Sequence, residues 1–295
     1  MAPYTGRMTD EALAALRDWQ AEGTPVALAT VTRVTGSAPR QPGSKLAISA
    51  DRRIAGSVSG GCVEGDVIEQ AIHVLRDRTP RLVHYGISDE MGMSVGLMCG
   101  GEIDVVIEPA DEALAEFASA AAQGGVVERS LPLTDFTDHV APPPRLWVIG
   151  AGHVAEHVVA MGARAGFAPV VIDPRRLFAQ QDRFADADVR VVWPDVAFSE
   201  VQLGPSDYVV VLSHDPKLDE PALRAALGGQ PAYVGAIGSK KAQADRRERL
   251  RAAGVSEAQL ARLHAPIGLD LGGREPGEIA VSIVAELVSV RHRAR

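Results

Sequence analysis

The chain has 295 residues and a formal net charge of −8 at pH 7, so it is long enough for two ordinary domains, and its acidity argues against nucleic acid as a partner. No apolar run approaches the ~18 residues that a membrane span requires, and residues 1–22 lack the basic start and apolar core of a secretory signal. The two cysteines are too few for a disulfide framework, so we expect a cytoplasmic protein with reduced thiols and no membrane contact.

The first part of the chain, residues 1–127, predicts a smaller α+β domain built from short strands. Helical and extended patterns follow one another there without regular alternation. The expected elements, in chain order, are a helix over residues 10–21, strands over 24–34 and 44–50, a helix from about 63 to 75, and strands over 81–87 and 102–109.

Residues 128–144 predict a linker. The stretch is polar, shows no periodicity and ends in three consecutive prolines at 142–144. Consecutive prolines favour an extended spacer. We therefore expect a domain boundary here, with a second domain over residues 145–295.

The second domain alternates strand and helix signals, which predicts an α/β fold with a parallel sheet covered on both faces. In its last helix, Ala280, Ile283 and Leu287 lie on one apolar stripe. The expected strands cover residues 145–150, 167–173, 189–193, 207–214 and 231–238, and the expected helices cover 153–166, 219–228, 239–253 and 275–291.

A glycine fingerprint, "VIGAGHVA", lies between the first strand and the first helix of this domain. Gly150 makes a tight turn, Gly152 lets the backbone approach a phosphate, and Ala155 lets helix and strand pack closely; His153 lies in the same turn. Asp173 closes the next strand, 18 residues after Ala155, where an acid would meet a ribose hydroxyl. Together these features predict a Rossmann-like fold that holds a phosphate-bearing ligand, although such glycines also serve packing alone.

Further polar loops follow other strands of this domain, at 213–219, 235–241 and 265–278. Ligands of open α/β sheets bind at the carboxyl ends of the strands, so these loops are expected near the fingerprint. In the loop at 235–241, a glycine, a serine and a lysine at a helix start suit an anion. The loop at 213–219 contains a histidine, but it could equally be a turn that caps a helix. The candidate ligand residues are His214, Gly238, Ser239 and Lys240. Arg175 and Arg176 beside Asp173 could accept an extra phosphate or could equally be a solvated pair.

One cysteine of the first domain lies in a glycine-rich stretch, "GSVSGGCVEGDV". The apolar helical face that follows begins at about Val63, so Cys62 is expected at or beside a helix N-terminus, whose positive end favours a thiolate. The glycines let a bulky group approach the sulfur, and Glu64 can cap amides or take part in proton transfer. Cys62 and Glu64 are therefore catalytic candidates; the alternative is that Cys62 is a small buried hydrophobe.

The second cysteine has similar surroundings. "GLMCGGEIDV" places Cys99 before two glycines and an acid, which makes it a further catalytic candidate. Neither cysteine has a second ligand at Cys-x-x-Cys spacing, so the pattern fits no zinc site. The loop "TGSAPRQPGSKLAIS" adds Arg40 and Lys45, cations that could hold an anionic group near Cys62 or stand in solvent.

Several motifs in the same order resemble those of the XdhC/CoxI family, accessory proteins in the maturation of xanthine dehydrogenase-type molybdenum hydroxylases. The resemblance covers nearly the whole chain outside the linker. In the first domain the matching stretches are "GSAPRQPGSKLAIS", "GSVSGGCVEGDV" and "CGGEIDVVIEP". In the second they are "VIGAGHVAEHV", "VVIDPRRLFAQQDRF", "VVVLSHDPKLD", "YVGAIGSKK" and "APIGLDLGGREPGEIAVSIVAE".

The resemblance implies a chaperone, more a maturation factor than an enzyme, that binds the molybdenum cofactor, protects its sulfurated form and inserts it into an apo-hydroxylase. It also implies a cysteine desulfurase as a partner. We expect the pterin phosphate near Gly150, Gly152 and Gly238, with a dinucleotide form of the cofactor as an alternative. We expect Cys62 to be the sulfur ligand of the metal or a sulfur relay. A homodimer is the default assembly.

Two other functions fit part of the sequence. The fingerprint and Asp173 suit an NAD(P)-dependent oxidoreductase, but no hydride-transfer constellation is evident. Similar fingerprints also occur in nucleotide-sensing regulatory modules, a reading that leaves the first domain unexplained.

Overall fold

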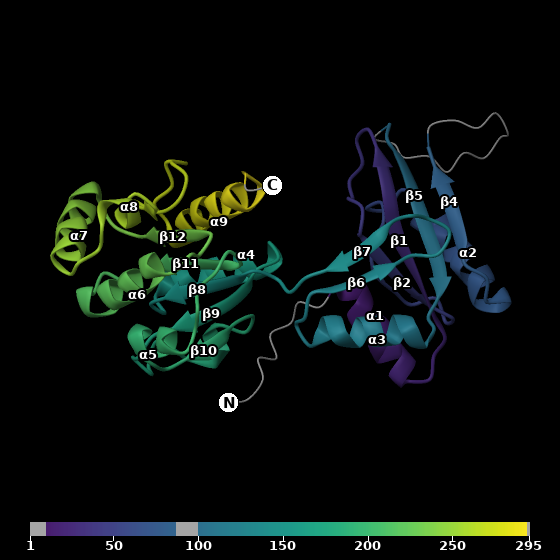
Figure 1. Cartoon of the computed structure of the whole chain (residues 1–295), viewed down its shortest axis with the longest axis horizontal. Coiled ribbons are helices and arrows are strands. Elements are labelled where there is room, and N and C mark those ends of the chain that lie inside the picture. Colours follow the sequence, from purple (N-terminus) through teal and green to yellow (C-terminus); the bar gives the residue numbers. More distant parts are fainter. Residues whose placement is uncertain (1–9, 87–99, 294–295) are drawn as a thin grey trace. The chain divides into compact units, whose positions relative to one another are not determined.

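The computed structural model describes residues 10–86 and 100–293, which form two compact units whose boundary in the chain falls between Pro142 and Pro143. Figure 1 shows the elements of both units in chain order. Cys99, one of the predicted catalytic residues, lies outside the described residues.

The first unit is built on a five-stranded sheet in which every neighbouring pair of strands is antiparallel. The strand order is β3-β2-β1-β5-β4. The strands are β1 (Val26–Thr35), β2 (Lys45–Ser49), β3 (Ile54–Gly56), β4 (Arg81–Tyr85) and β5 (Glu102–Pro109).

Helices cover both faces of this sheet, which explains the apolar run in the middle of β1. Helix α2 (Glu64–Asp77) packs on one face, where Ala29 and Val31 belong to the core. Helices α1 (Glu11–Ala21) and α3 (Glu112–Ala122) pack on the other face, against Leu28. The predicted α+β layout is therefore present, and the sequence reading missed β3 and α3.

The stretch predicted to be a linker instead contains an antiparallel hairpin, β6 (Val127–Ser130) and β7 (Thr137–Val140). Asp138 of β7 is fully buried and accepts a hydrogen bond of 2.8 Å from the Lys45 ammonium. Arg129 of β6 forms a bidentate pair with Glu108. These buried contacts attach the hairpin to the first unit, so the stretch is not an extended spacer.

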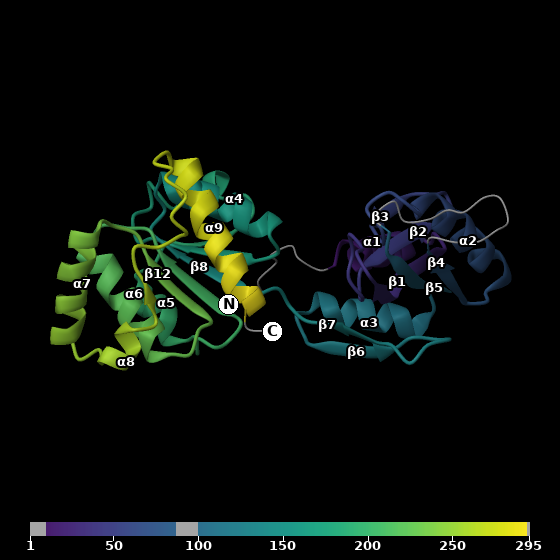
Figure 2. The ribbon, with the colours of Figure 1, turned by 90° about the horizontal axis from the view of Figure 1, so that it is seen from above.

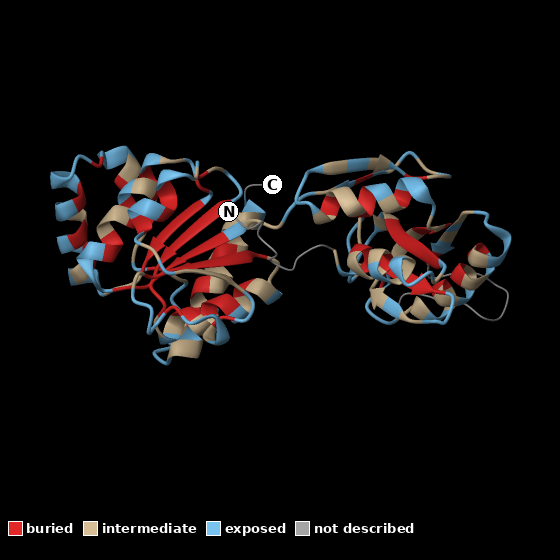
Figure 3. Cartoon of the chain, turned by 90° about the horizontal axis from the view of Figure 1, so that it is seen from below, coloured by how far each residue is buried: buried red, intermediate tan, exposed pale blue. Residues whose placement is uncertain are grey.

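The second unit contains a six-stranded sheet in the order β10-β9-β8-β11-β12-β13, and all its neighbouring strands are parallel. Numbered by chain position, this order is the Rossmann order, so the predicted fold is confirmed. Figure 3 shows that the inner strands of this sheet are buried. The strands are β8 (Arg145–Ile149), β9 (Ala168–Ile172), β10 (Asp188–Arg190), β11 (Asp207–Val211), β12 (Tyr233–Ala236) and β13 (Leu263–His264).

Two groups of helices cover this sheet. Helices α4 (His153–Arg164) and α9 (Pro276–Arg293) pack side by side on one face, with Ala280, Ile283 and Leu287 in the core as expected (Figure 2). The other face carries α5 (Pro194–Ser199), α6 (Pro216–Gly228), α7 (Lys240–Ala252) and α8 (Glu257–Leu260). A 3-10 turn covers Gln181–Arg183. The sequence reading missed α5, α8 and β13, which are too short to show a period.

Within residues 10–86 and 100–293, no helix is both long enough and apolar enough to cross a membrane.

Candidate functional site

The fingerprint turn lies where the strand order of the second unit reverses, at the carboxyl ends of the neighbouring strands β8 and β11. Gly150 follows β8 with a positive φ of 96°, and an added Cβ would lie 3.0 Å from the Cβ of Ser213, which follows β11. A side chain at position 150 would therefore be strained and crowded. Ligands of sheets with this topology bind at this reversal point.

Helix α4 starts at this point with a glycine as its N-cap. Gly152 has extended backbone, and no side chain within the described residues caps the helix. An added Cβ at Gly152 would meet nothing within 4 Å. Ala155 is fully buried against the sheet, as its position in the fingerprint predicts. The Ala155 amide donates to the carbonyl of Gly152 at 3.0 Å. The amides of residues 153 and 154, which precede it in the first turn, are thus the ones available to an external anion.

Helices α6 and α7, which also start at this edge, are capped by their own side chains. Asp215, the N-cap of α6, accepts a hydrogen bond of 3.0 Å from the Lys217 amide. Ser239, the N-cap of α7, accepts one of 3.2 Å from the Ala242 amide. Ser239 therefore already fills part of the α7 anion position, and a carboxylate occupies that of α6. Of the three helices, α4 is the one best suited to a phosphate.

The remaining predicted residues of this edge lie on its surface. His214 is exposed beside the capping Asp215, and Lys240 is exposed in the first turn of α7. Gly238 has a positive φ of 136° in the loop that precedes the helix. These positions agree with the predicted gathering of loops at the carboxyl edge of the sheet.

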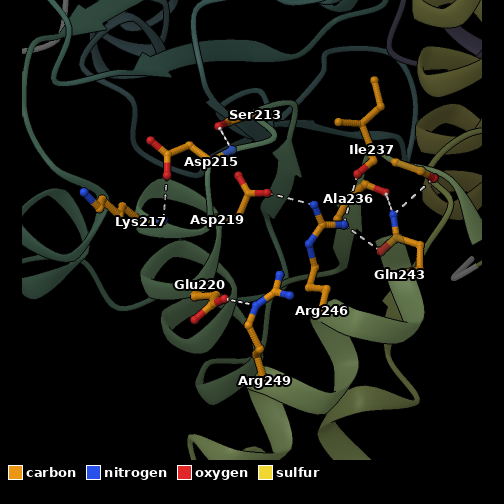
Figure 4. A network of polar contacts seen from close by, with 11 residues as sticks. Ser213, Asp215, Lys217, Asp219, Glu220, Ala236, Ile237, Gln243, Arg246 and Arg249 are labelled. Atoms are coloured by element: carbon orange, nitrogen blue, oxygen red, sulfur yellow. Dashed lines mark hydrogen bonds and ion pairs between the residues drawn. The ribbon is translucent and has the colours of Figure 1, made fainter. Parts of the chain in front are cut away.

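A buried polar network, which the sequence reading missed, fixes the loop before α7 (Figure 4). Arg246 donates a hydrogen bond of 2.8 Å to Asp219 of α6, one of 3.0 Å to the carbonyl of Ile237, and another to Gln243. Gln243 donates to the carbonyls of Ala236 and Gly238. Burial raises the pKa of Asp219, although Arg246 opposes this shift. The side chains hold the loop carbonyls toward the protein interior.

A second histidine lies one helical turn beyond His153. The rings of His153 and His157 are 5.6 Å apart between centroids. A Cβ added to Gly277, in the first turn of α9, would lie 3.9 Å from Nδ1 of His157. The i, i+4 spacing from His153 could have identified His157 as a neighbour of the fingerprint turn.

Asp173 is at the end of β9 as predicted, but its carboxylate is fully buried. It accepts hydrogen bonds from the Ala151 amide and from Arg175. The expected role of Asp173 as an acceptor for a ribose hydroxyl is therefore not available in this arrangement.

In the first unit, the glycine-rich loop before α2 folds around the carboxylate of Glu64. The carboxylate accepts hydrogen bonds from the amides of residues 58–61 and from the hydroxyls of Ser57 and Ser59. Partial burial alone would raise the pKa of Glu64, but these hydrogen bonds outweigh it and lower the pKa to about 2. Glu64 thus stays ionised and caps amides, the first of its two predicted roles; the low pKa argues against proton transfer near neutral pH.

Cys62 is half-buried and lies two positions before the first residue of α2, as predicted. Its amide donates a hydrogen bond of 3.0 Å to the Ser59 hydroxyl, and its side chain packs at the edge of the core under α2. The residue as a whole is therefore not fully buried.

The three glycine-rich segments of the first unit meet around this loop. A Cβ added to Gly60 would lie 3.7 Å from Pro39, and one added to Gly101 would lie 2.2 Å from the carbonyl oxygen of Ser37. The segment at 100–101 thus contacts the loop at 36–39, which contacts the Cys62 loop. Arg40 lies on this middle loop and is exposed.

Lys45 does not fill its predicted role. Its side chain is 2% exposed and its ammonium contacts Asp138 at 2.8 Å and Asp10 at 3.6 Å. A buried ammonium that is already paired holds the hairpin and α1 to the sheet, and is not open to an anionic ligand. Among the described residues, no group of three or more histidines, cysteines or acids is arranged to hold a metal ion.

Two family models match the chain. Residues 146–287 match the XdhC Rossmann domain, and residues 19–86 match the XdhC and CoxI family. Each matched range falls within one of the two units.

Relatives with assigned names match along most of the chain. It is 29% identical to YqeB of Escherichia coli (strain K12), over 92% of this chain, but it spans only 44% of the length of YqeB. It is 28% identical to a probable xanthine dehydrogenase subunit of Bacillus subtilis (strain 168), with 90% of this chain and 93% of that protein covered. It is 26% identical to the molybdenum cofactor insertion chaperone PaoD of Escherichia coli (strain K12), with 91% and 84% covered.

A solved structure also resembles this one. The crystal structure of a xanthine dehydrogenase from Bacillus halodurans matches with a TM-score of 0.83 and 26% sequence identity, over 98% of this chain and 97% of that chain. With both family models placed in order on its two units, the chain belongs to the XdhC and CoxI family.

Proposed function

We propose that this protein binds the molybdenum cofactor and inserts it into a xanthine dehydrogenase-type molybdenum hydroxylase. The observation that carries the proposal is the uncapped turn of α4 at the reversal point of the sheet. The named relatives support the choice of cargo, because one is a molybdenum cofactor insertion chaperone and another is a probable part of a xanthine dehydrogenase.

The second unit would bind the phosphate of the pterin cargo. The amides that follow Gly152 donate hydrogen bonds, and the positive end of α4 favours the negative charge. His153 is exposed in the first turn, where its imidazole can donate a further hydrogen bond. The loop at 236–238, which follows β12 at the same edge of the sheet, is held in place by Arg246 and Gln243.

The first unit would present a sulfur atom to the cargo. Glu64 takes up the amides of the loop and so fixes the backbone that carries Cys62. A thiolate is a soft ligand, and a cysteine can bind a metal centre in this form. We propose Cys62 as this ligand or as a relay for sulfur, with Arg40 as an exposed cation on the adjoining loop.

Further parts of the proposal concern the setting. The protein would protect the sulfurated form of the cofactor, receive sulfur through a cysteine desulfurase, and perform no turnover of its own. It would act in the cytoplasm, as its low cysteine content favours, and as a homodimer.

An NAD(P)-dependent oxidoreductase is the second candidate, and the Gly150-x-Gly152-x-x-Ala155 fingerprint favours it. The buried, fully engaged carboxylate of Asp173 weakens this reading, because the ribose of NAD needs an acceptor at that position.

The deciding experiment is to purify the protein from a molybdenum-replete host, denature it, and record pterin fluorescence and nicotinamide absorbance of the released small molecules. Our proposal predicts pterin and also predicts that the loaded protein activates an apo-hydroxylase. Released nicotinamide without pterin, or pterin that never activates the apo-enzyme, would contradict it.

A further inference from the structure

The loop after β9 contains Arg175, whose side chain covers the carboxylate of Asp173. Oδ1 of Asp173 accepts hydrogen bonds of 2.9 Å from both the amide and Nε of Arg175. Oδ2 accepts one of 2.7 Å from Nη2 of Arg175 and one of 2.8 Å from the Ala151 amide. An ionised carboxylate offers about four acceptor positions, so these contacts use its capacity.

Arg175 is also held from a second side. Its guanidinium lies 4.3 Å from the centroid of the Phe178 ring, a cation–π contact. The hydrogen bond to Asp173 and the negative charges of Asp173 and Asp215 raise the pKa of Arg175, so its guanidinium stays protonated. The Asp173 side chain is completely buried beneath it, whereas the Arg175 side chain remains 44% exposed.

In nucleotide-binding sheets of this topology, an acid at the end of the second strand recognises the ribose diol of NAD. Here a diol could reach Asp173 only by displacing a bidentate, stacked arginine. The guanidinium that pairs with Asp173 therefore occupies the position that a ribose diol would need.

We infer that Arg175 determines ligand specificity in the second unit: it excludes from the α4 turn those dinucleotides whose ribose diol must reach Asp173 at the end of β9. This inference rests on the proposed function in placing the ligand at that turn. It deepens that function because it disfavours a dinucleotide form of the pterin cargo relative to the form that ends in a phosphate monoester.

NADH is the probe for the test, with its fluorescence measured during titration of the purified full-length protein. Arg175→Ala uncovers the carboxylate and should tighten NADH binding on the order of tenfold, the value of one hydrogen bond to a charged group. Arg175→Lys, which keeps the charge and disturbs the fold less, should give a smaller gain in the same direction.

Two further variants distinguish the effect of exposing Asp173 from the effect of removing a positive charge. Arg176→Ala removes a positive charge from the same loop, but the hydrogen bonds to Asp173 come from Ala151 and Arg175, so this variant should bind NADH as weakly as wild type. Adding Asp173→Asn to Arg175→Ala should abolish the gain. Circular dichroism checks that each variant is folded.

The inference is overturned if wild type binds NADH as tightly as Arg175→Ala, or if Arg176→Ala gives the same gain. It is also overturned if Asp173→Asn leaves the gain intact. Pterin release from the same wild-type preparation decides the proposed function separately, so failure of one does not imply failure of the other.

Discussion

The two glycine-rich turns of this protein look alike in sequence but use their amides in opposite ways. In the first unit, the amides of residues 58–61 turn inward to the carboxylate of Glu64. In the second unit, the turn at 150–152 ends in a helix whose N-cap has no side chain. The amides of the first turn already bind the Glu64 carboxylate, whereas the amides of the second can bind an anion of a ligand.

Because of this difference, the two turns are suited to different functions. A loop with an internal carboxylate cannot hold a phosphate with the same amides, so it serves to fix the neighbouring Cys62. A helix start without a cap is left with unsatisfied donors, which a phosphate would satisfy. Glycine content alone therefore does not indicate a phosphate site, because a nearby acidic side chain can already bind the amides of the turn.

The largest effect should come from breaking the buried network behind the second turn. Arg246→Ala leaves the buried Asp219 without its partner, which should reduce the free energy of unfolding of the second unit by about 3–5 kcal/mol. Burial already raises the pKa of Asp219, so this loss should shrink at acidic pH, where the carboxyl can protonate. Denaturant unfolding followed by circular dichroism measures it.

Arg249→Ala is the matched control on the same helix. Arg249 pairs with Glu220 at a partly exposed position, so its removal should cost at most about 1 kcal/mol. Equal losses for the two variants would show that the Arg246 network contributes no more than a surface pair.

The next effect concerns the internal anion of the first turn. Glu64→Gln places a neutral group with its own donors among the loop amides, and should cost about 1–3 kcal/mol of unfolding free energy. Glu69, on the same helix, provides the control because it forms an exposed pair with Arg52 of the turn between β2 and β3. Glu69→Gln should change stability by less than about 1 kcal/mol.

The same residue predicts a pH dependence. Because the folded pKa of Glu64 is lowered to about 2 from a reference of 4.5, its contribution is complete above pH 4.5 and is lost as the pH falls toward 2. Wild type should therefore lose more stability than Glu64→Gln over this interval. Parallel curves for the two proteins would contradict the assignment of Glu64 as the internal anion.

A smaller change should follow at the thiol that this loop carries. Cys62→Ser keeps the size of the side chain but replaces a soft ligand by a hard one, and should reduce cofactor retention or transfer roughly tenfold. Retention is measured as pterin that co-elutes with the protein, and transfer as activity gained by an apo-hydroxylase. If both stay at the wild-type level, Cys62 serves packing alone.

Much of the second unit could be predicted from sequence, because buried parallel strands such as Val170–Ile172 and Val209–Val211 are continuous apolar runs. The hairpin of the first unit could not, since its strands are short and largely polar. Its key residue, Asp138, is an acid in a polar stretch, and its burial depends on an ion pair with Lys45 in another strand.

The candidate site was predictable to the same extent. The spacing of Gly150, Gly152 and Ala155 located the turn, because each position imposes a local steric requirement. Arg246 could not be found, since it lies in the strongly charged helix "KKAQADRRERLRA", where charged side chains are normally solvated. The engagement of Asp173 by Arg175 also depends on side-chain geometry that spacing does not specify.

The most direct test of the comparison is to introduce a carboxylate into the turn at 150–152 that can bind the first amides of α4. Gly152 has extended backbone and space for a side chain, so Gly152→Asp can cap α4 as Asp215 caps α6 without loss of stability. Binding of the released molybdenum cofactor, measured by pterin fluorescence, should weaken on the order of tenfold or more through like-charge repulsion, and Gly152→Asn, which caps without the charge, should lose less. Unchanged cofactor binding by a folded Gly152→Asp variant would contradict the account.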